Sequence, residues 1–151
     1  MIKMKRLFIL VFTEGTTIMH SSPEKIKNYS SYIPVKNAVK KIKTWKEKGC
    51  EISYLTSRRL QREIKQVEEV LKKFNFPKGT LYYRKKGEEY RDVVERLRPD
   101  IFIDDDCESI GGNNIKEIIN QKLNIKIVIV KEFGGIDYLP EEPRDLLNFS
   151  D

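Results

Sequence analysis

Three groups of polar side chains stand directly after apolar runs of this sequence. Glu14 follows the first run, Thr56 and Ser57 follow the second, and three consecutive aspartates, Asp104–Asp106, follow a later one. Consecutive carboxylates repel one another unless a cation or basic groups offset them, and such hard oxygen ligands suit Mg²⁺. Hydroxyl and free backbone N–H groups before a helix, with Arg58 beside them, suit a phosphate. Taken singly, the acids could equally form a solvated turn and Thr56 an ordinary helix cap.

The elements that would position these groups follow from hydrophobic periodicity. Apolar runs alternate with helical patterns, which is typical of a parallel sheet with crossover helices. The predicted strands are Arg6–Thr13, Glu51–Leu55, Thr80–Tyr83, Asp100–Asp104 and Lys126–Val130. We therefore predict an α/β fold, a three-layer, doubly wound (Rossmann-like), mainly parallel five-stranded sheet with helices on both faces. Ligands bind beyond the carboxyl ends of such strands, so the polar groups should lie close together.

Four helices are predicted between the strands from their apolar stripes. The second stripe runs from Leu60 to Phe74, and the fourth contains Ile115, Ile118, Ile119 and Leu123. These stripes predict core rather than a cofactor site. The segment from His20 to Pro34 is predicted to be a loop or flap.

Length and composition limit the classes of protein. The 151 residues predict a single domain over 1–151, with a core at about 6–131 and an irregular C-terminal extension at 132–151. With 34% charged and 39% hydrophobic residues, the composition is that of a globular domain. The run Leu7–Phe12 is too short to cross a membrane. The two cysteines form no CxxC pair, so neither a disulfide framework nor a zinc site is indicated, and we expect a cytoplasmic protein without a membrane partner.

The net charge of +6 is concentrated near the N-terminus, where residues 1–48 carry 11 basic and 3 acidic side chains. This excess suits either a face toward a phosphate-bearing partner or simply a solvated, Lys-rich helix.

Together, the motifs resemble those of the haloacid dehalogenase-like (HAD) superfamily of phosphohydrolases. The second motif reads Ile-Ser-Tyr-Leu-Thr-Ser-Arg from Ile52 to Arg58, and the last reads Pro-Asp-Ile-Phe-Ile-Asp-Asp-Asp from Pro99 to Asp106. The resemblance covers roughly residues 6–130 and implies Mg²⁺-dependent hydrolysis of a phosphomonoester. A gap of about fourteen residues after the first motif, with no insertion after the third strand, implies a capless member. An open site suits a phosphorylated small molecule or a phosphorylated macromolecule.

The first motif departs from the family pattern Asp-x-Asp-Gly-Thr. Aligning Gly15 and Thr16 places Glu14 at the second aspartate and Phe12 at the first, which is the family's nucleophile. A phenyl ring can neither attack phosphorus nor coordinate a cation. The sequence therefore predicts an inactive or much altered enzyme, a pseudoenzyme that binds a phosphate or a phosphorylated ligand.

The resemblance implies a role for each matched residue. Glu14 would be the general acid/base and a further metal ligand, Thr56 would contact the phosphate, and Lys85 or Lys86 would clamp its charge. Asp104 and Asp105 would hold Mg²⁺. The predicted phosphate contacts are Gly15, Thr16, Thr56, Ser57 and Arg58.

Two alternatives remain open. An active phosphohydrolase could use a metal-bound water in place of the missing aspartate. A Toprim-like protein would use Glu14, Asp104 and Asp106 to bind Mg²⁺ for nucleic-acid chemistry, and its basic N-terminal third would then face phosphates.

Overall fold

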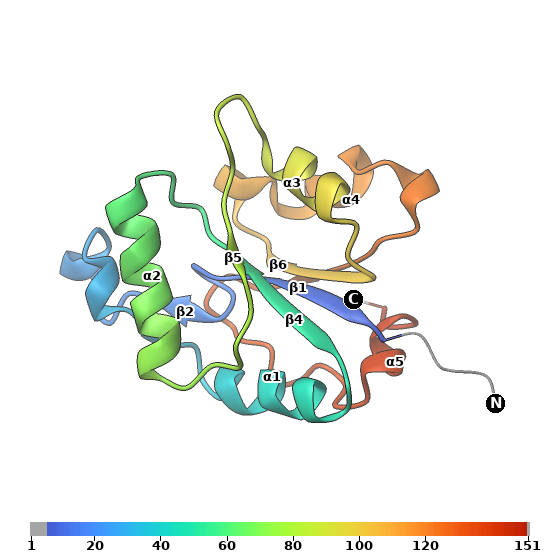
Figure 1. The fold of residues 1–151 in the computed structure, drawn as a ribbon, viewed down its shortest axis with the longest axis horizontal. Coiled ribbons are helices and arrows are strands. Elements are labelled where there is room, and N and C mark those ends of the chain that lie inside the picture. Colours follow the sequence, from blue (N-terminus) through green and yellow to red (C-terminus); the bar gives the residue numbers. More distant parts are fainter. Residues whose placement is uncertain (1–5, 151) are drawn as a thin grey trace.

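The computed structural model describes residues 6–150 and contains one five-stranded parallel sheet in the order β5-β4-β1-β6-β7 (Figure 1). The strands are β1 (Phe8–Phe12), β4 (Glu51–Leu55), β5 (Leu81–Tyr82), β6 (Ile101–Asp105) and β7 (Lys126–Val130). The predicted three-layer α/β fold is confirmed. Strand β6 begins and ends one residue later than predicted, so both of its aspartates lie within the strand.

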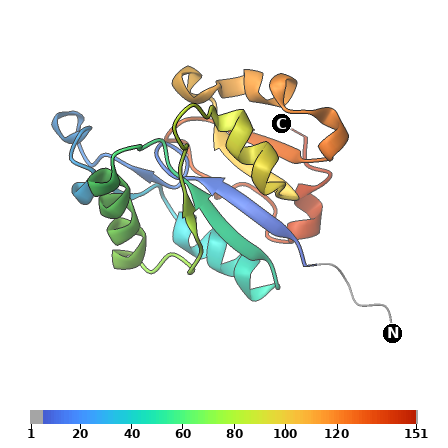
Figure 2. The ribbon, with the colours of Figure 1, turned by 45° about the horizontal axis from the view of Figure 1, so that its top comes forward.

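Helices cover both faces of the sheet (Figures 1 and 2). Helices α1 (Ala38–Glu47) and α2 (Gln61–Lys73) pack on one face, and α3 (Tyr90–Leu97) and α4 (Ile115–Ile118) pack on the other. Side chains along a strand point alternately to the two faces, so Val11 of β1 joins the core beneath α1 and α2 while Phe12 joins the core beneath α3 and α4.

The segment predicted as a flap is a short antiparallel hairpin, β2 (Ile18–Met19) with β3 (Ile33–Pro34), and two 3-10 turns at Pro23–Lys25 and Tyr29–Ser31. The rings of Tyr29 and Tyr32 are buried in the core on the α1 and α2 side. These rings anchor the segment beside the carboxyl end of β1.

The C-terminal extension packs on α1. It contains the short helix α5 (Pro143–Leu146), and Ile136, Leu139 and Leu146 are buried in the same core as Trp45. The Trp45 Nε1 donates to the carbonyl oxygen of Pro140 at 3.0 Å. Residues 132–150 therefore contribute to the hydrophobic core.

Two residues assigned to apolar stripes are instead exposed. Leu60 is 57% exposed because it is the extended N-cap of α2, outside the helix. Ile118 is 47% exposed because α4 ends there and Ile119 has extended dihedrals, which interrupts the fourth stripe. The helices predicted from hydrophobic periodicity were therefore too long, at the N-terminal end of α2 and at the C-terminal end of α4. Among residues 6–150, every helix is too short or too polar to cross a bilayer.

The order of the strands reverses beside β1. The chain runs outward from β1 to β4 and β5, and then returns to add β6 and β7 on the other side. The carboxyl ends of β1, β4 and β6 consequently lie next to one another, where doubly wound sheets place their ligands.

The edge strand β5 is held close to β4 at Gly79. A Cβ added there would lie 2.2 Å from the carbonyl oxygen of Ile52. We expect Gly79→Ala to lower the free energy of unfolding by about 1–3 kcal/mol, because the two backbones must move apart. Denaturant unfolding measures this change. Lys78→Ala, at the exposed neighbouring residue, is the control, and equal stability of the two variants would contradict the close approach.

Candidate functional site

A pocket of about 470 Å³ opens beyond the carboxyl ends of the central strands. Of the residues predicted to form the site, Phe12, Glu14, Gly15, Ser57 and Arg58 line it. The structure thus brings the first and second motifs together at the edge of the sheet where strand order reverses.

Phe12 fills the position that the resemblance assigns to the nucleophile. Its side chain is fully buried, and its ring meets the Tyr90 ring of α3 edge-on with the centroids 5.6 Å apart. Burial raises the pKa of Tyr90 to about 12, so its phenol is neutral at physiological pH. The floor of the pocket is therefore a pair of packed aromatic rings.

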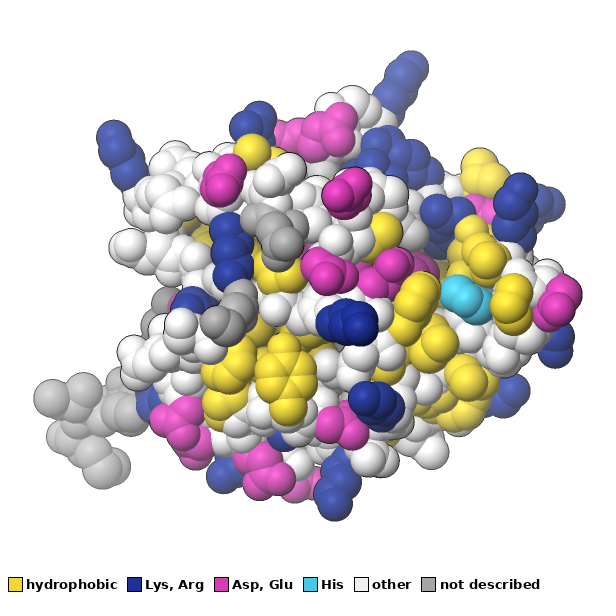
Figure 3. All heavy atoms as spheres, turned by 180° about the vertical axis from the view of Figure 1, so that it is seen from behind, with side chains coloured by type: hydrophobic (Ala, Val, Ile, Leu, Met, Phe, Trp, Pro, Cys, Tyr) yellow, Lys and Arg dark blue, Asp and Glu magenta, His cyan; other side chains and the backbone are white. Residues whose placement is uncertain are grey.

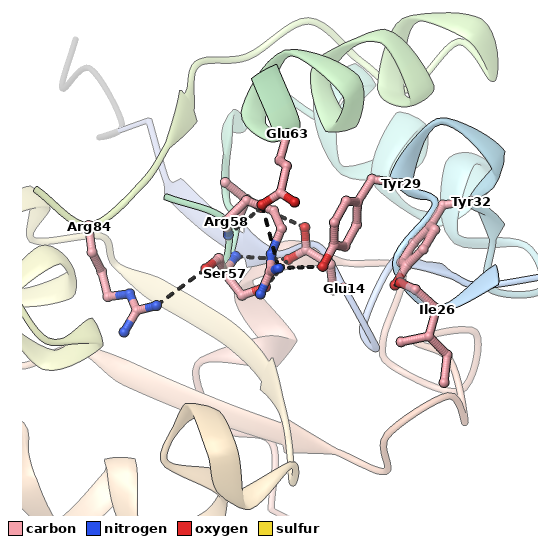
Figure 4. Close-up of polar contacts among 9 residues, drawn as sticks. Glu14, Ile26, Tyr29, Tyr32, Ser57, Arg58, Glu63 and Arg84 are labelled. Atoms are coloured by element: carbon pink, nitrogen blue, oxygen red, sulfur yellow. Dashed lines mark hydrogen bonds and ion pairs between the residues drawn. The ribbon is translucent and has the colours of Figure 1, made fainter. Parts of the chain in front are cut away.

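Glu14 points across to the end of β4 (Figure 4). Its Oε1 accepts hydrogen bonds from the Ser57 N–H at 2.8 Å, the Ser57 hydroxyl at 3.1 Å and the Thr13 hydroxyl at 2.7 Å. Its Oε2 accepts one from the Thr56 hydroxyl at 2.5 Å. The donors predicted to hold a phosphate thus already hold an oxyanion, the protein's own carboxylate.

Gly15 and Thr16, also predicted to contact phosphate, instead contact Asp105. The Thr16 hydroxyl donates to Asp105 Oδ2 at 2.7 Å. Gly15 has a φ of +90°, and a Cβ added there would lie 2.8 Å from the same oxygen. A glycine is needed here both for the left-handed backbone and for the close approach of the carboxylate.

Arg58 links the pocket to the flap segment (Figure 4). Its guanidinium donates to the Tyr29 hydroxyl and lies 3.7 Å from Glu63 Oε1, while its Nε donates to the Ser57 hydroxyl at 3.2 Å. Burial raises the pKa of Tyr29, and the positive charge of Arg58 opposes that rise. Arg58 therefore joins β4, α2 and the flap.

Arg84, which the sequence analysis missed, is the second arginine of the pocket. Its guanidinium lies 4.1 Å from the Tyr90 ring centroid and donates to the carbonyl oxygen of Ser57 at 3.2 Å. Lys85 and Lys86, the predicted charge clamp, are exposed and do not line the pocket. The sequence did contain a signal for Arg84. Side chains two residues apart in an extended chain point to the same face, so Arg84 should point to the same side as Tyr82, which packs with the core beneath α3.

The three aspartates at the carboxyl end of β6 do not converge. Asp105 accepts hydrogen bonds from Thr16 and from the Cys107 N–H at 3.0 Å, whereas the exposed Asp106 accepts one from the Glu132 N–H at 2.8 Å. Asp104 is fully buried; its Oδ1 accepts from the Asp105 N–H at 2.7 Å, and its Oδ2 has no hydrogen-bond partner among residues 6–150. Burial is the largest cause of a raised pKa for both buried acids, well above the ordinary value for Asp104 and to about 6 for Asp105.

The predicted Mg²⁺ ligands Glu14 and Asp105 have different hydrogen-bond partners. Glu14 turns to β4 and away from Asp105, whose hydrogen bonds come from Thr16 and Cys107. In the described part of the chain, one group could hold a metal ion: ligand atoms of Asp105, Cys107 and Glu132 lie within 4.8 Å of one another. A cysteine sulfur suits a softer cation than Mg²⁺. The binding of Mg²⁺ by Glu14, Asp104 and Asp105 stays a prediction.

The pocket also has an apolar wall. It is formed by Ile26 and Tyr32 of the flap segment, by His20, and by Phe133 after β7. The His20 and Phe133 rings meet edge-on at 5.1 Å, and Ile26 and Phe133 are 49% and 38% exposed. Figure 3 shows the histidine among hydrophobic side chains, with acidic side chains beside them. The pocket thus combines charged groups with exposed hydrocarbon.

Comparisons with known proteins support the fold. Neither a protein-family model nor a curated protein matches the sequence. A chain of the Pnkp1/Rnl/Hen1 complex is similar at 13% identity with a TM-score of 0.63, over 86% of this chain and 48% of that chain. A second structure, of the Pnkp1/Rnl/Hen1 RNA repair complex, gives 14% identity and a TM-score of 0.61, over 84% and 43%. This chain therefore spans less than half the length of either neighbour.

A third solved structure is D,D-heptose 1,7-bisphosphate phosphatase from B. bronchiseptica, complexed with magnesium and phosphate. It is similar at 10% identity with a TM-score of 0.52, over 84% of this chain and 93% of that chain. Similarity at such low identity shows the fold alone. The chain therefore shares the α/β fold of these neighbours.

The buried acids predict how stability depends on pH. A pKa that is higher in the folded state contributes stability at low pH that is lost as the pH rises. The folded-state pKa of Asp105 is about 6 against an ordinary value of 3.8, and the shift of Asp104 has the same sign. We expect the free energy of unfolding, measured with a chelator present, to fall as the pH rises through this interval. Asp105→Asn should flatten the fall, whereas wild-type stability that increases over the interval would contradict it.

Proposed function

We propose that this protein binds a phosphorylated ligand in the pocket and does not hydrolyse it. The observation that carries the proposal is the buried ring of Phe12, packed on Tyr90 where the fold's hydrolases would need a nucleophile. The groups that could bind a phosphate are present and support a role in ligand binding. Hydroxyl and N–H donors of Thr56 and Ser57 converge on an oxyanion, and Arg58 and Arg84 line the same pocket.

The neighbouring carboxylates do not supply the missing nucleophile. Glu14 accepts four hydrogen bonds, which hold its carboxylate against the end of β4. Both oxygens of Asp105 accept hydrogen bonds as well. Asp104 is fully buried. Because each of these carboxyl groups is buried or hydrogen-bonded to the protein, we propose that the protein binds its ligand without the covalent step.

The fold of the neighbours supports the class of ligand. One is a phosphatase complexed with magnesium and phosphate, and another belongs to the Pnkp1/Rnl/Hen1 RNA repair complex. A phosphorylated small molecule and a phosphorylated macromolecule, including the end of a nucleic acid, are the two classes that fit. A capless site, with the short hairpin β2–β3 as the segment beside it in residues 6–150, would leave room for either.

One observation favours a second function, hydrolysis by a metal-bound water. Cys107 and Glu132 line the pocket, and together with the buried Asp105 they could hold the cation that such a water needs. The two functions differ in whether phosphate is released.

Phosphate release decides between them. Purified protein is incubated with p-nitrophenyl phosphate and nucleoside monophosphates in Mg²⁺, Mn²⁺ or Zn²⁺, and we expect no release above a blank. Release by the wild type that is lost in Asp105→Asn would overturn the proposal and establish the metal-bound water.

Binding of an intact phosphoester tests the other half of the proposal. Calorimetry with a nucleoside monophosphate should give a saturable heat that is reduced at least tenfold in affinity in Arg84→Ala, because a charge-assisted contact is lost. Arg91→Ala removes an exposed arginine of α3 outside the pocket and is the matched control. Equal affinities of the two variants would show that the ligand binds elsewhere.

Restoring the aspartate at residue 12 should not restore an enzyme. Phe12→Asp replaces a fully buried ring with a carboxyl beside the Tyr90 ring, so we expect a loss of about 3 kcal/mol or more in unfolding free energy and no phosphate release. Phe12→Leu, a hydrophobic control, should lose clearly less. A Phe12→Asp variant that is as stable as Phe12→Leu and hydrolyses phosphoesters would contradict the account of this position.

A further inference from the structure

The carboxylate of Glu14 occupies the anion-binding donors of this pocket in the way an external oxyanion would. One oxygen sits on the Ser57 N–H and hydroxyl and on the Thr13 hydroxyl, and the other sits on the Thr56 hydroxyl. These four donors, from Thr13, Thr56 and Ser57, are called the cradle below. Thr13 and Thr56 are fully buried, and the Thr13 hydroxyl has a second acceptor in the Leu55 carbonyl oxygen at 3.2 Å.

The backbone that carries Glu14 is fixed. The N–H of Gly15 donates to the Ile18 carbonyl oxygen, and the Gly15 carbonyl oxygen accepts from the Phe133 N–H, both at 2.8 Å. Glu14 itself lines the pocket and is partly exposed. The carboxylate can therefore leave the cradle by rotation of the side chain into the pocket, with the turn after β1 unchanged.

A tethered group competes strongly with a free one. A group joined to its site by a few bonds acts at an effective concentration of about millimolar or higher, so a free anion with no other contacts must exceed that concentration to replace it. A ligand that contacts the pocket elsewhere has additional binding energy. The apolar wall of Ile26, Tyr32, His20 and Phe133, together with Arg84, offers such contacts outside the cradle.

We infer that Glu14 is an internal competitor for the cradle and determines its specificity. It excludes inorganic phosphate and admits a phosphorylated organic ligand, whose remaining atoms contact the wall while its phosphate replaces the carboxylate. The inference rests on the proposed function for the identity of the ligand, but the competition itself concerns the cradle alone. Removal of the Glu14 carboxylate then converts the pocket into a site for free phosphate.

Calorimetric titration with inorganic phosphate at constant ionic strength tests the inference. We expect the wild type to bind phosphate at least tenfold more weakly than Glu14→Ala, and Glu14→Gln, which keeps an acceptor oxygen, to lie between them. Glu132→Gln removes an equal charge from the same pocket without touching the cradle, so it measures the gain that relief of repulsion alone would give. The gain of Glu14→Ala should exceed that of Glu132→Gln at least fivefold.

A second variant shows whether the phosphate enters the cradle. Adding Thr56→Val to Glu14→Ala removes one donor and should reverse the gain in phosphate affinity. Thermal unfolding with and without phosphate serves as an independent readout in case Glu14→Ala is less stable: phosphate should raise its Tm more than that of the wild type. Equal phosphate affinity in the wild type and Glu14→Ala, or a gain that survives Thr56→Val, would overturn the inference.

These outcomes are separable from those of the proposed function. If the wild type hydrolyses phosphoesters while Glu14→Ala still gains phosphate affinity, the internal competition stands and the non-hydrolytic function fails. If the wild type binds a nucleoside monophosphate intact but Glu14→Ala gains nothing for inorganic phosphate, the function stands and the inference fails.

Discussion

The contact between Glu14 and the end of β4 fixes the arrangement of the whole pocket. Strands β1 and β4 pair in parallel with Phe12 opposite Leu55, and the Thr13 N–H continues the ladder to the Leu55 carbonyl oxygen at 2.9 Å. This register sets Glu14 beside Ser57, and the carboxylate closes the gap with four hydrogen bonds. Buried hydroxyls need such a partner, because leaving them unpaired would cost about 1–3 kcal/mol each. The donors that hold Glu14 in the folded protein are thus the same donors that, in the function we propose, would bind an anion.

The same end of the sheet combines buried aromatic rings with hydrogen-bond donors and cations. Phe12, at the position where the resemblance implies a nucleophile, packs on Tyr90 and contributes to the core under α3. Asp105 receives the Thr16 hydroxyl, which ties the first motif to β6. Arg84 and Arg58 each contact Ser57 and remain at the pocket surface. The pocket thus contains a set of hydrogen-bond donors and cations, which is the requirement for binding an anion.

Local hydrophobic patterns predicted the strands of this fold, whereas side-chain positions that depend on residues distant in sequence could not be predicted. Apolar runs alternating with period-3.6 patterns predicted all five strands of the sheet. The rule for parallel sheets predicted that Glu14, Thr56 and a lysine would meet; Glu14 and Thr56 do, whereas Lys85 and Lys86 do not line the pocket. Leu60 was assigned to a helix because hydrophobic patterns do not mark where helical dihedrals begin. The rotamer of Glu14 and the inward turn of Arg84 depend on neighbours distant in sequence, Thr56 and Tyr90, which no local pattern contains. Tyr29 and Tyr32 anchor a segment whose serines and proline suggested only a loop.

The central claim is that the pocket binds a phosphoester and leaves it intact. Phosphorus NMR of the wild-type protein with a nucleoside monophosphate and divalent cation follows both events in one sample. The account predicts that the ester resonance shifts or broadens on addition of protein, that the change is lost in Arg84→Ala, and that the ester signal keeps its area over hours. A growing signal of inorganic phosphate that disappears in Asp105→Asn would contradict it.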